Sequence, residues 1–300
     1  MTGQFVNGAQ SVLRFSDLPA EPRKMLPRIQ DYEEMPLVTL EAAVDPLMTL
    51  VPDVGRMVST VKQSHITEEH NLTVDESASI LLYSMEWEPR DKSFYIILNQ
   101  TLQAVNRNLL RPWFLYLRLV MTALAKLPSD ARRLIVYRGV KVDLRAQYPT
   151  GSIIIWWGFS LCTTSLQVLN DERTLGRSGT RTMFNIECHS AKSIKSFSFY
   201  PAEEEVLLTP GCQFEVSSCL TQGEGLHIIY LKEIQPKFPL INPVPIPQSS
   251  HPPPILPPHC GNSRLQKCID ALYLDPVIIS FCAITFARQL AGEFTIETRV

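Results

Sequence analysis

The chain has 300 residues, of which 45% are hydrophobic and 19% are charged, a composition typical of a globular protein and not of a disordered one. Its formal net charge of −2 gives no basic surface for nucleic acid or for an anionic membrane. Seven cysteines without a C-x-x-C pair exclude zinc-finger spacing, so we expect neither a metal site nor a nucleic-acid partner.

The two ends of the chain show no targeting or membrane segment. Residues 1–18 lack a continuous apolar stretch behind a basic end, which argues against a secretory signal. The apolar run Val277–Ala287 is too short to cross a bilayer. We therefore expect no membrane span and a cytoplasmic location.

The first half of the chain predicts helices. Residues 1–65 are interrupted by prolines, and we interpret them as an irregular N-terminal extension with one or two small helices within 37–61. Thr73 and Glu76 form a capping box at the start of the first regular helix. Apolar residues at helical spacing then predict a helix over 94–109, which stops before Pro112, and a helix over 113–127, which is closed by Pro128.

From Leu134 the pattern changes to strands. Helices followed by strands favour an α+β domain, and no G-x-G-x-x-G or P-loop motif is present. A proline-rich stretch, 242–259, is predicted to be an extended linker, and 260–300 is a tail of unknown role. The predicted strands are Leu134–Arg138, Ile153–Trp157, Thr182–Cys188, Ala202–Leu208, Phe214–Cys219 and Leu226–Ile234.

Two acidic residues in the strand Ala202–Leu208 are the strongest candidates for chemistry. In an extended strand Glu203 and Glu205 lie on one face, and paired carboxylates suit a reaction at a sugar carbon that develops positive charge. The alternative is a solvated charge run on an edge strand. Two other polar segments accompany them: Arg138 and Gly139 at a strand end, and the hydroxyl-rich turn Gly158–Ser165.

An arginine, a hydroxyl element and a pair of acids in this order resemble the arginine–serine–glutamate class of mono-ADP-ribosyltransferases. The resemblance is closest to the animal-type NAD-dependent arginine ADP-ribosyltransferases and covers about Leu72–Ile241. The matching stretches are Leu72–Glu76, Leu81–Glu86, Pro112–Phe114, Val136–Val140, Ser196–Phe199, Glu203–Leu208 and Phe214–Val216.

The resemblance implies a fold, an activity and partners. It implies an ADP-ribosyltransferase fold of two packed, mostly antiparallel sheets with an N-terminal helical layer, here a catalytic domain at 66–241. The implied reaction transfers ADP-ribose from NAD or NADP to protein arginine and releases nicotinamide, without a metal, in a protein that we expect to be monomeric. Two alternatives stay open: an NAD glycohydrolase using the same site, and a catalytically silent NAD-binding or interaction module.

The resemblance also implies residue roles. Arg138 would contact a phosphate, for which its planar guanidinium is suited, and Gly139 would bind the nicotinamide amide through its backbone. Glu205 would be the catalytic glutamate that holds the nicotinamide ribose and stabilises the oxocarbenium-like centre. Glu203 would orient the acceptor guanidinium and remove a proton during attack.

The hydroxyl element departs from the family pattern, which reads aromatic-x-Ser-x-Ser. Counting from Phe159 places Leu161 at the first serine and Thr163 at the second. A shift by one residue places Ser160 there instead, and we assign the role to Ser160 with Thr163 as support. If Leu161 holds that position, the group that orients Glu205 is missing. Three aromatic residues before the acids either shape the acceptor surface or pack in the interior: Phe197, Phe199 and Tyr200.

Overall fold

The computed structural model describes residues 4–5, 25–64, 69–128, 133–172, 174–223 and 225–245. The chain divides into two units, Met1–Pro247 and Gln248–Val300, and all described residues belong to the first. The predicted tail and most of the predicted linker therefore lie outside the described residues.

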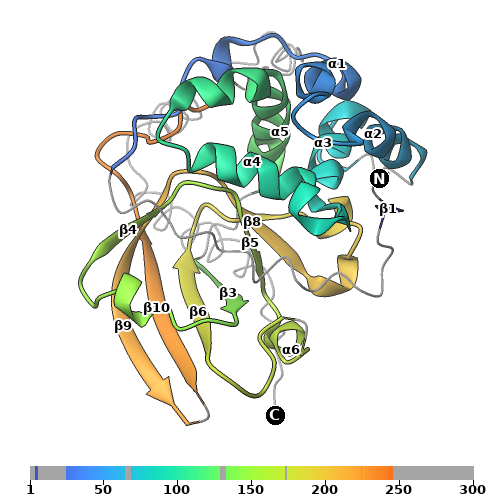
Figure 1. The fold of residues 1–300 in the computed structure, drawn as a ribbon. Coiled ribbons are helices and arrows are strands. Elements are labelled where there is room, and N and C mark those ends of the chain that lie inside the picture. The colour runs from blue at the N-terminus through green and yellow to red at the C-terminus, as the bar shows by residue number, and fades with distance from the viewer. Residues whose placement is uncertain are drawn as a thin grey trace, which may run out of the picture. The chain divides into compact units, whose positions relative to one another are not determined.

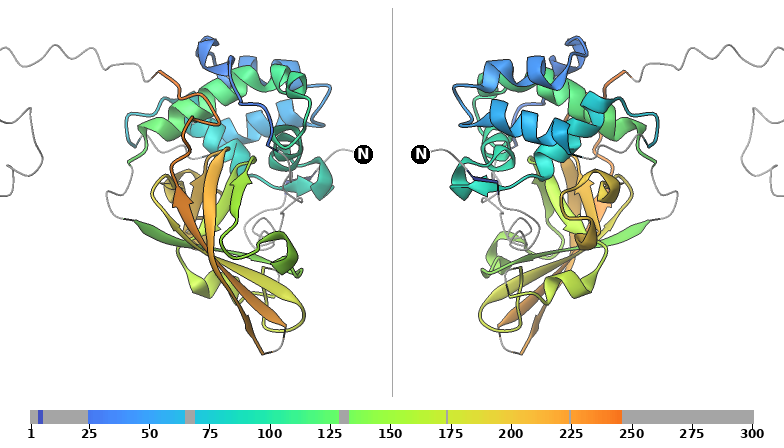
Figure 2. Two further views of the ribbon diagram at one scale, coloured as in Figure 1. Left: turned by 90° about the vertical axis from the view of Figure 1, so that its left-hand side faces the viewer. Right: turned by 90° about the vertical axis from the view of Figure 1, so that its right-hand side faces the viewer.

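A layer of helices lies on one side of the strands (Figures 1 and 2). The predicted capping box is confirmed: the Glu76 amide donates to Thr73 Oγ1 at 3.2 Å and the Thr73 amide donates to Glu76 Oε2 at 2.7 Å. The layer consists of α1 (Leu40–Val44), α2 (Val54–Gln63), α3 (Val74–Ser84), α4 (Phe94–Leu102) and α5 (Phe114–Lys126). A short sixth helix, α6 (Leu166–Leu169), comes between two strands in the sequence.

The second long helix is shorter than its apolar spacing predicts. Helix α4 ends at Leu102, and residues 107–113 form a 3-10 helix that contains Pro112. The Arg107 guanidinium donates to the carbonyls of Leu102 and Ala104, so a side chain takes over the bonding that a further helical turn would supply. The same guanidinium lies 4.7 Å from the ring centre of Trp157.

Eight strands form one hydrogen-bonded ladder in the order β4-β9-β10-β6-β3-β5-β8-β7, and the short β1 pairs with β2 elsewhere. Pairing is antiparallel except between β10 and β6. The ladder strands are β3 (Leu134–Val140), β4 (Ile153–Trp156), β5 (Ser160–Thr163), β6 (Arg181–Cys188), β7 (Lys192–Ser193), β8 (Glu205–Leu208), β9 (Cys212–Gln222) and β10 (Leu226–Ile234), and the remaining pair is β1 (Gln4–Phe5) with β2 (Trp87–Glu88).

The ladder is nearly divided between β3 and β5, which are joined by the single pair Tyr137 and Thr163. Five strands lie on one side of this junction and three on the other. Both groups bury side chains in a common cluster, which we call the inter-sheet core; it includes Val136, Phe184 and Ile229 from the five-stranded group and Val206 from the three-stranded group. The predicted two-sheet α+β arrangement is therefore present as a five-stranded and a three-stranded group that pack on a common core and are joined by one residue pair.

A second cluster, the helical core, lies between the helices and the three-stranded group. Leu161 of β5 and Leu207 of β8 belong to this helical core, whereas their neighbours Cys162 and Val206 belong to the inter-sheet core. Alternate residues of a strand point to opposite faces, so β5 and β8 serve both cores.

Residues 25–64 are part of this folded body. The predicted small helices within 37–61 are confirmed as α1 and α2, and their buried residues lie in the helical core. The segment around Ile29 pairs with Ile241, whose neighbour Asn242 donates its amide to the Ile29 carbonyl at 2.9 Å. None of the helices in the described ranges is long and apolar enough to span a bilayer.

Candidate functional site

The three sequence elements with candidate residues lie on consecutive strands, β3, β5 and β8. Arg138 follows Tyr137 on β3, Tyr137 pairs with Thr163 of β5, and Thr163 pairs with Glu205 of β8. Segments separated by tens of residues in the sequence therefore meet within three strands of one ladder.

Glu205 is fully buried at the start of β8. The hydroxyl of Ser198 donates to Glu205 Oε2 and accepts a hydrogen bond from the Tyr200 amide at 2.9 Å. Sequence reasoning included Ser198 only within a matching stretch and gave it no role. The available signal was a hydroxyl seven residues before the acid, but only the turn between them brings the two side chains together.

Ser160 and Thr163 lie on opposite faces of β5. The turn expected there is a strand, in which Thr163 pairs with Glu205 and Ser160 pairs with Leu208. Paired residues of adjacent strands share a face, so Thr163 lies on the face of Glu205 and Ser160 on the face of the inter-sheet core. Leu161, which the count from Phe159 places at the first serine of the motif, pairs with Leu207, and both side chains lie in the helical core.

Thr163 holds the backbone of the acidic turn. Its hydroxyl donates to the Glu203 carbonyl at 2.7 Å and accepts from the Ser165 amide at 3.0 Å. The hydroxyl of Thr163 therefore fixes the peptide that carries Glu203 next to β5.

Glu203 does not lie in a strand with Glu205, so the prediction of two carboxylates on one strand face was wrong. Residues 201–203 form a 3-10 turn with Pro201 at its first position, and Glu204 follows in the left-handed region at φ 47°. Proline fixes φ near the helical value and favours such a turn start. Glu203 is half-buried on the turn while Glu205 is buried, so the two acids have different environments.

Glu204, between the two acids, joins two segments. Its Oε2 accepts from the Thr164 hydroxyl at 3.1 Å, and its Oε1 lies 3.4 Å from Lys195 Nζ. The preceding aromatic residues are chiefly packing groups, because Phe197 and Tyr200 are each only 4% exposed.

Arg138 is 3% exposed and pairs with Phe184, so its side chain lies on the inter-sheet face of β3. One guanidinium nitrogen donates to the Leu161 carbonyl at 3.3 Å, and the guanidinium carbon lies 5.9 Å from the ring centre of Trp156. Arg138 thus links β3 to β5 where the two groups of strands join.

Gly139 lies on the opposite face of β3 from Arg138. A Cβ at this position would lie 2.8 Å from Leu175 Cβ, so the segment after α6 packs directly against the Gly139 backbone. The absence of a side chain at 139 is required by this contact within the protein itself.

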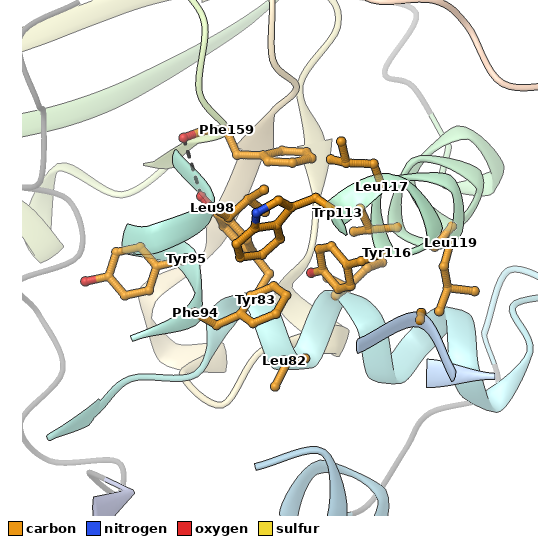
Figure 3. Packing of buried hydrophobic residues seen from close by; sticks show 14 of the residues in the cluster. Leu82, Tyr83, Phe94, Tyr95, Leu98, Trp113, Tyr116, Leu117, Leu119 and Phe159 are labelled. Carbon is orange, nitrogen blue, oxygen red and sulfur yellow. Dashed lines mark hydrogen bonds between the residues drawn. The ribbon is translucent and has the colours of Figure 1, made fainter. Parts of the chain in front are cut away.

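The entry to β5 is fixed by the helical layer. The side chain of Asn99 on α4 accepts from the Phe159 amide at 3.0 Å and donates to the Phe159 carbonyl at 3.1 Å. Tyr83 packs its ring 5.2 Å from that of Phe159, and its hydroxyl donates to the same carbonyl (Figure 3). The helices therefore set the position of the strand that carries Thr163.

Other reactive groups in the described ranges are structural. Burial raises the pKa of the Cys162 thiol to about 12, so this cysteine is not a nucleophile at neutral pH. His227 is buried beside Thr221, and His189 contacts Glu233 at 3.1 Å. No group of three or more histidine, cysteine or acidic residues suitable for a metal occurs in the part of the chain that the structure describes.

Comparisons with known proteins identify the family. The model of the family "NAD:arginine ADP-ribosyltransferase" matches residues 56–238, more than half of the chain. The chain therefore belongs to the arginine ADP-ribosyltransferase family, and its α+β fold is the fold of that family.

A curated chicken (Gallus gallus) protein, NAD(P)(+)--arginine ADP-ribosyltransferase 2, is 34% identical over 118 residues, covering 39% of this chain. The match spans about a third of the chicken protein's length (35%). Among solved structures, exoenzyme S from Pseudomonas aeruginosa superimposes with a TM-score of 0.47 at 16% identity, covering 65% of this chain and 88% of that one. The eukaryotic mono-ADP-ribosyltransferase ART2.2 gives a TM-score of 0.46 at 18% identity, covering 66% and 85%.

Proposed function

We propose that this chain transfers ADP-ribose from NAD, or NADP, to arginine side chains of proteins and releases nicotinamide. The observation that carries the proposal is the buried Glu205, held by Ser198 and paired with Thr163, in a chain of the arginine ADP-ribosyltransferase family. The catalytic domain is proposed to be 66–241, and helices α1 and α2, which precede it, pack in the same helical core.

The environments of the two acids suit two different steps. A buried carboxylate stabilises developing positive charge strongly, because a low-dielectric site screens little. Glu205 is proposed to hold the ribose and stabilise its cationic centre as the bond to nicotinamide breaks. The half-buried Glu203 is proposed to contact the acceptor guanidinium, which enters from solvent and must lose a proton during attack. Arg138 and Gly139 are proposed to contact the dinucleotide, with Leu175 moving from the Gly139 backbone when nicotinamide binds.

The test uses labelled NAD and an arginine-rich protein acceptor, with nicotinamide release and acceptor labelling measured separately. Glu205→Gln keeps the size of the side chain and is expected to lower release about 100- to 1,000-fold. Glu203→Gln is expected to abolish labelling while release into water continues. Glu88→Gln, an exposed acid on β2, is the matched control and should leave both rates unchanged.

Each result decides between the proposal and its alternatives. Release without labelling in the wild type supports the NAD glycohydrolase, and no release by either wild type or Glu205→Gln supports a silent module. Equal labelling by wild type and Glu203→Gln would contradict the role of Glu203. The monomeric state and a cytoplasmic location stay predictions from the sequence, to be checked by light scattering and by cell fractionation.

A further inference from the structure

We propose that Ser198 is the positioning residue for Glu205, supplying the hydroxyl that the sequence pattern assigns to the β5 element. This inference rests on the proposed function, because it takes Glu205 to be the catalytic acid. It concerns a residue outside the arginine, hydroxyl and acid elements that define the class.

The β5 hydroxyls are directed elsewhere. Ser160 lies on the inter-sheet face, opposite to the face on which Glu205 and Thr163 are paired. Thr163 is on the correct face, but its hydroxyl donates to the Glu203 carbonyl and accepts from the Ser165 amide. A hydroxyl has one proton to donate, so Thr163 cannot also donate to Glu205 in this arrangement.

The hydroxyl of Ser198 is oriented toward Glu205 by its surroundings. It accepts a hydrogen bond from the Tyr200 amide at 2.9 Å, which leaves its single proton for Glu205 Oε2. The carboxylate and the hydroxyl therefore form a charge-assisted hydrogen bond, the stronger kind in proteins.

The segment that carries Ser198 is fixed at several points. The Phe199 amide donates to Ser84 Oγ on α3 at 3.3 Å, and the Ile194 amide donates to the backbone carbonyl of Glu205 at 3.0 Å. Phe197 is buried in the helical core. Because both neighbours of Ser198 are held, its hydroxyl fixes the plane of the Glu205 carboxylate instead of following it.

The consequence is specific for turnover. A carboxylate that has lost its orienting donor still occupies its place, but it samples orientations in which it does not stabilise the reacting ribose. Ser198→Ala should therefore lower kcat for nicotinamide release about 10- to 100-fold, the range for a hydrogen bond to a charged group. KM for NAD should change by less than about threefold, because the Glu205 carboxylate keeps its place beside the ribose and loses only its orientation toward the developing positive charge.

The experiment compares Ser198→Ala, Ser198→Thr and Ser193→Ala with the wild type. Threonine keeps the donor and should restore kcat to within about threefold of wild type, whereas Ser193, exposed on β7, is the matched control and should have no effect. Calorimetric NAD-binding stoichiometry and thermal unfolding measure the fraction of intact sites, which separates positioning from a loss of folded protein. If Ser198→Ala does not fold, Ser198→Cys replaces it, because a thiol is a weaker donor of similar size.

The outcomes separate the two proposals. An inactive wild type overturns the proposed function, and this inference with it. An active wild type with unchanged kcat in Ser198→Ala overturns the inference alone. A larger loss in Ser160→Ala or Thr163→Val than in Ser198→Ala would return the orienting role to β5.

Discussion

The helical core and the inter-sheet core are built on different principles. Phe94 of the helical core packs its ring 5.2 Å from Trp113 and 4.6 Å from Tyr116, residues within 22 positions of it. Phe184 of the inter-sheet core packs 4.9 Å from Tyr148 and 5.5 Å from Trp156. The rings of the first core come from helices that follow one another, whereas the rings of the second come from strands and loops farther apart in the chain.

The candidate site lies on the two strands that both cores share. On β5 and β8, Thr163 and Glu205 lie on the face toward the helical core, while Ser160 lies on the inter-sheet face together with Arg138 of β3. Because alternate residues of a strand point to opposite faces, the candidate residues fall into two groups, one on each face of the strands. Thr163 is paired with Glu205 on one face, whereas Arg138 lies on the opposite face, where its guanidinium donates to the Leu161 carbonyl and links β3 to β5.

Truncating one aromatic ring in each core gives the largest effects on stability. Phe184→Ala and Phe94→Ala both remove a fully buried ring and should each lower the free energy of unfolding by about 3–5 kcal/mol. Phe184 pairs with Arg138 and contacts Trp156, over which the guanidinium lies. Nicotinamide release per folded molecule should therefore fall more in Phe184→Ala.

Denaturant unfolding measures the stability change, and release rates normalised to bound NAD measure the effect on the site. Equal normalised rates in the two variants would show that the inter-sheet core does not position the site through Arg138.

The helical layer could be predicted well because its signals are local. The capping box at Thr73 and the apolar spacing of α3 and α5 depend on residues within a few turns of each other. Helix α4 is the exception: its apolar pattern continues past Leu102, but the helix ends there, and the Arg107 side chain donates to the Leu102 carbonyl. Such a contact between a single side chain and backbone carbonyls leaves no periodic signal.

The site could be predicted only as far as the order of its elements. The sequence placed Arg138, a hydroxyl element and Glu205 together, and the strand order agrees. It assigned the hydroxyl role to Ser160 with Thr163 as support, but Thr163 is the residue paired with Glu205 and Ser160 lies on the opposite face. The assignment failed because a shift of one residue reverses every side chain of a strand. Nor did the sequence predict the turn at Pro201, which separates Glu203 from the strand of Glu205.

Adding a methyl group at Gly139 should have an intermediate effect. The Cβ of Gly139→Ala would lie 2.8 Å from Leu175 Cβ, and a Cβ cannot swing away as the end of a long side chain can. We expect the free energy of unfolding to fall by about 1–3 kcal/mol, the usual range for overpacking. Denaturant unfolding of the wild type and the variant provides the measurement.

A double-mutant cycle locates this strain. Gly139→Ala should destabilise less in a Leu175→Gly background, in which the closest atoms are removed. The same cost in both backgrounds would mean that Leu175 does not limit the space at Gly139.

The smallest expected effect of a single residue is a contribution to pH dependence, and most of this dependence should come from the inter-sheet core. Three thiols, Cys162, Cys188 and Cys212, are buried in it. Burial raises the pKa of Cys162 and of Cys212 to about 12, and it also raises the pKa of Cys188, from an ordinary value of 9.0.

These shifts imply that stability falls as the pH rises. Above pH 9 the unfolded chain releases protons from thiols that the folded protein keeps protonated, so the unfolded state is favoured. Between pH 8 and pH 10 the loss should reach about 1.4 kcal/mol for each thiol. Below pH 8 the thiols are protonated in both states and make no difference.

Urea unfolding under reducing conditions at pH 8, 9 and 10 measures this slope. Cys162→Ala should lower the free energy of unfolding at every pH, because it leaves a small cavity. It should also reduce the fall in that free energy between pH 8 and pH 10 by the contribution of one thiol. Burial also raises the pKa values of Tyr32 and Tyr116. Free tyrosine is half ionised near pH 10, so each of these residues adds only about 0.4 kcal/mol to the loss by pH 10. A flat profile between pH 8 and pH 10 would mean that water reaches the inter-sheet thiols, and pH dependence would then not distinguish the two cores.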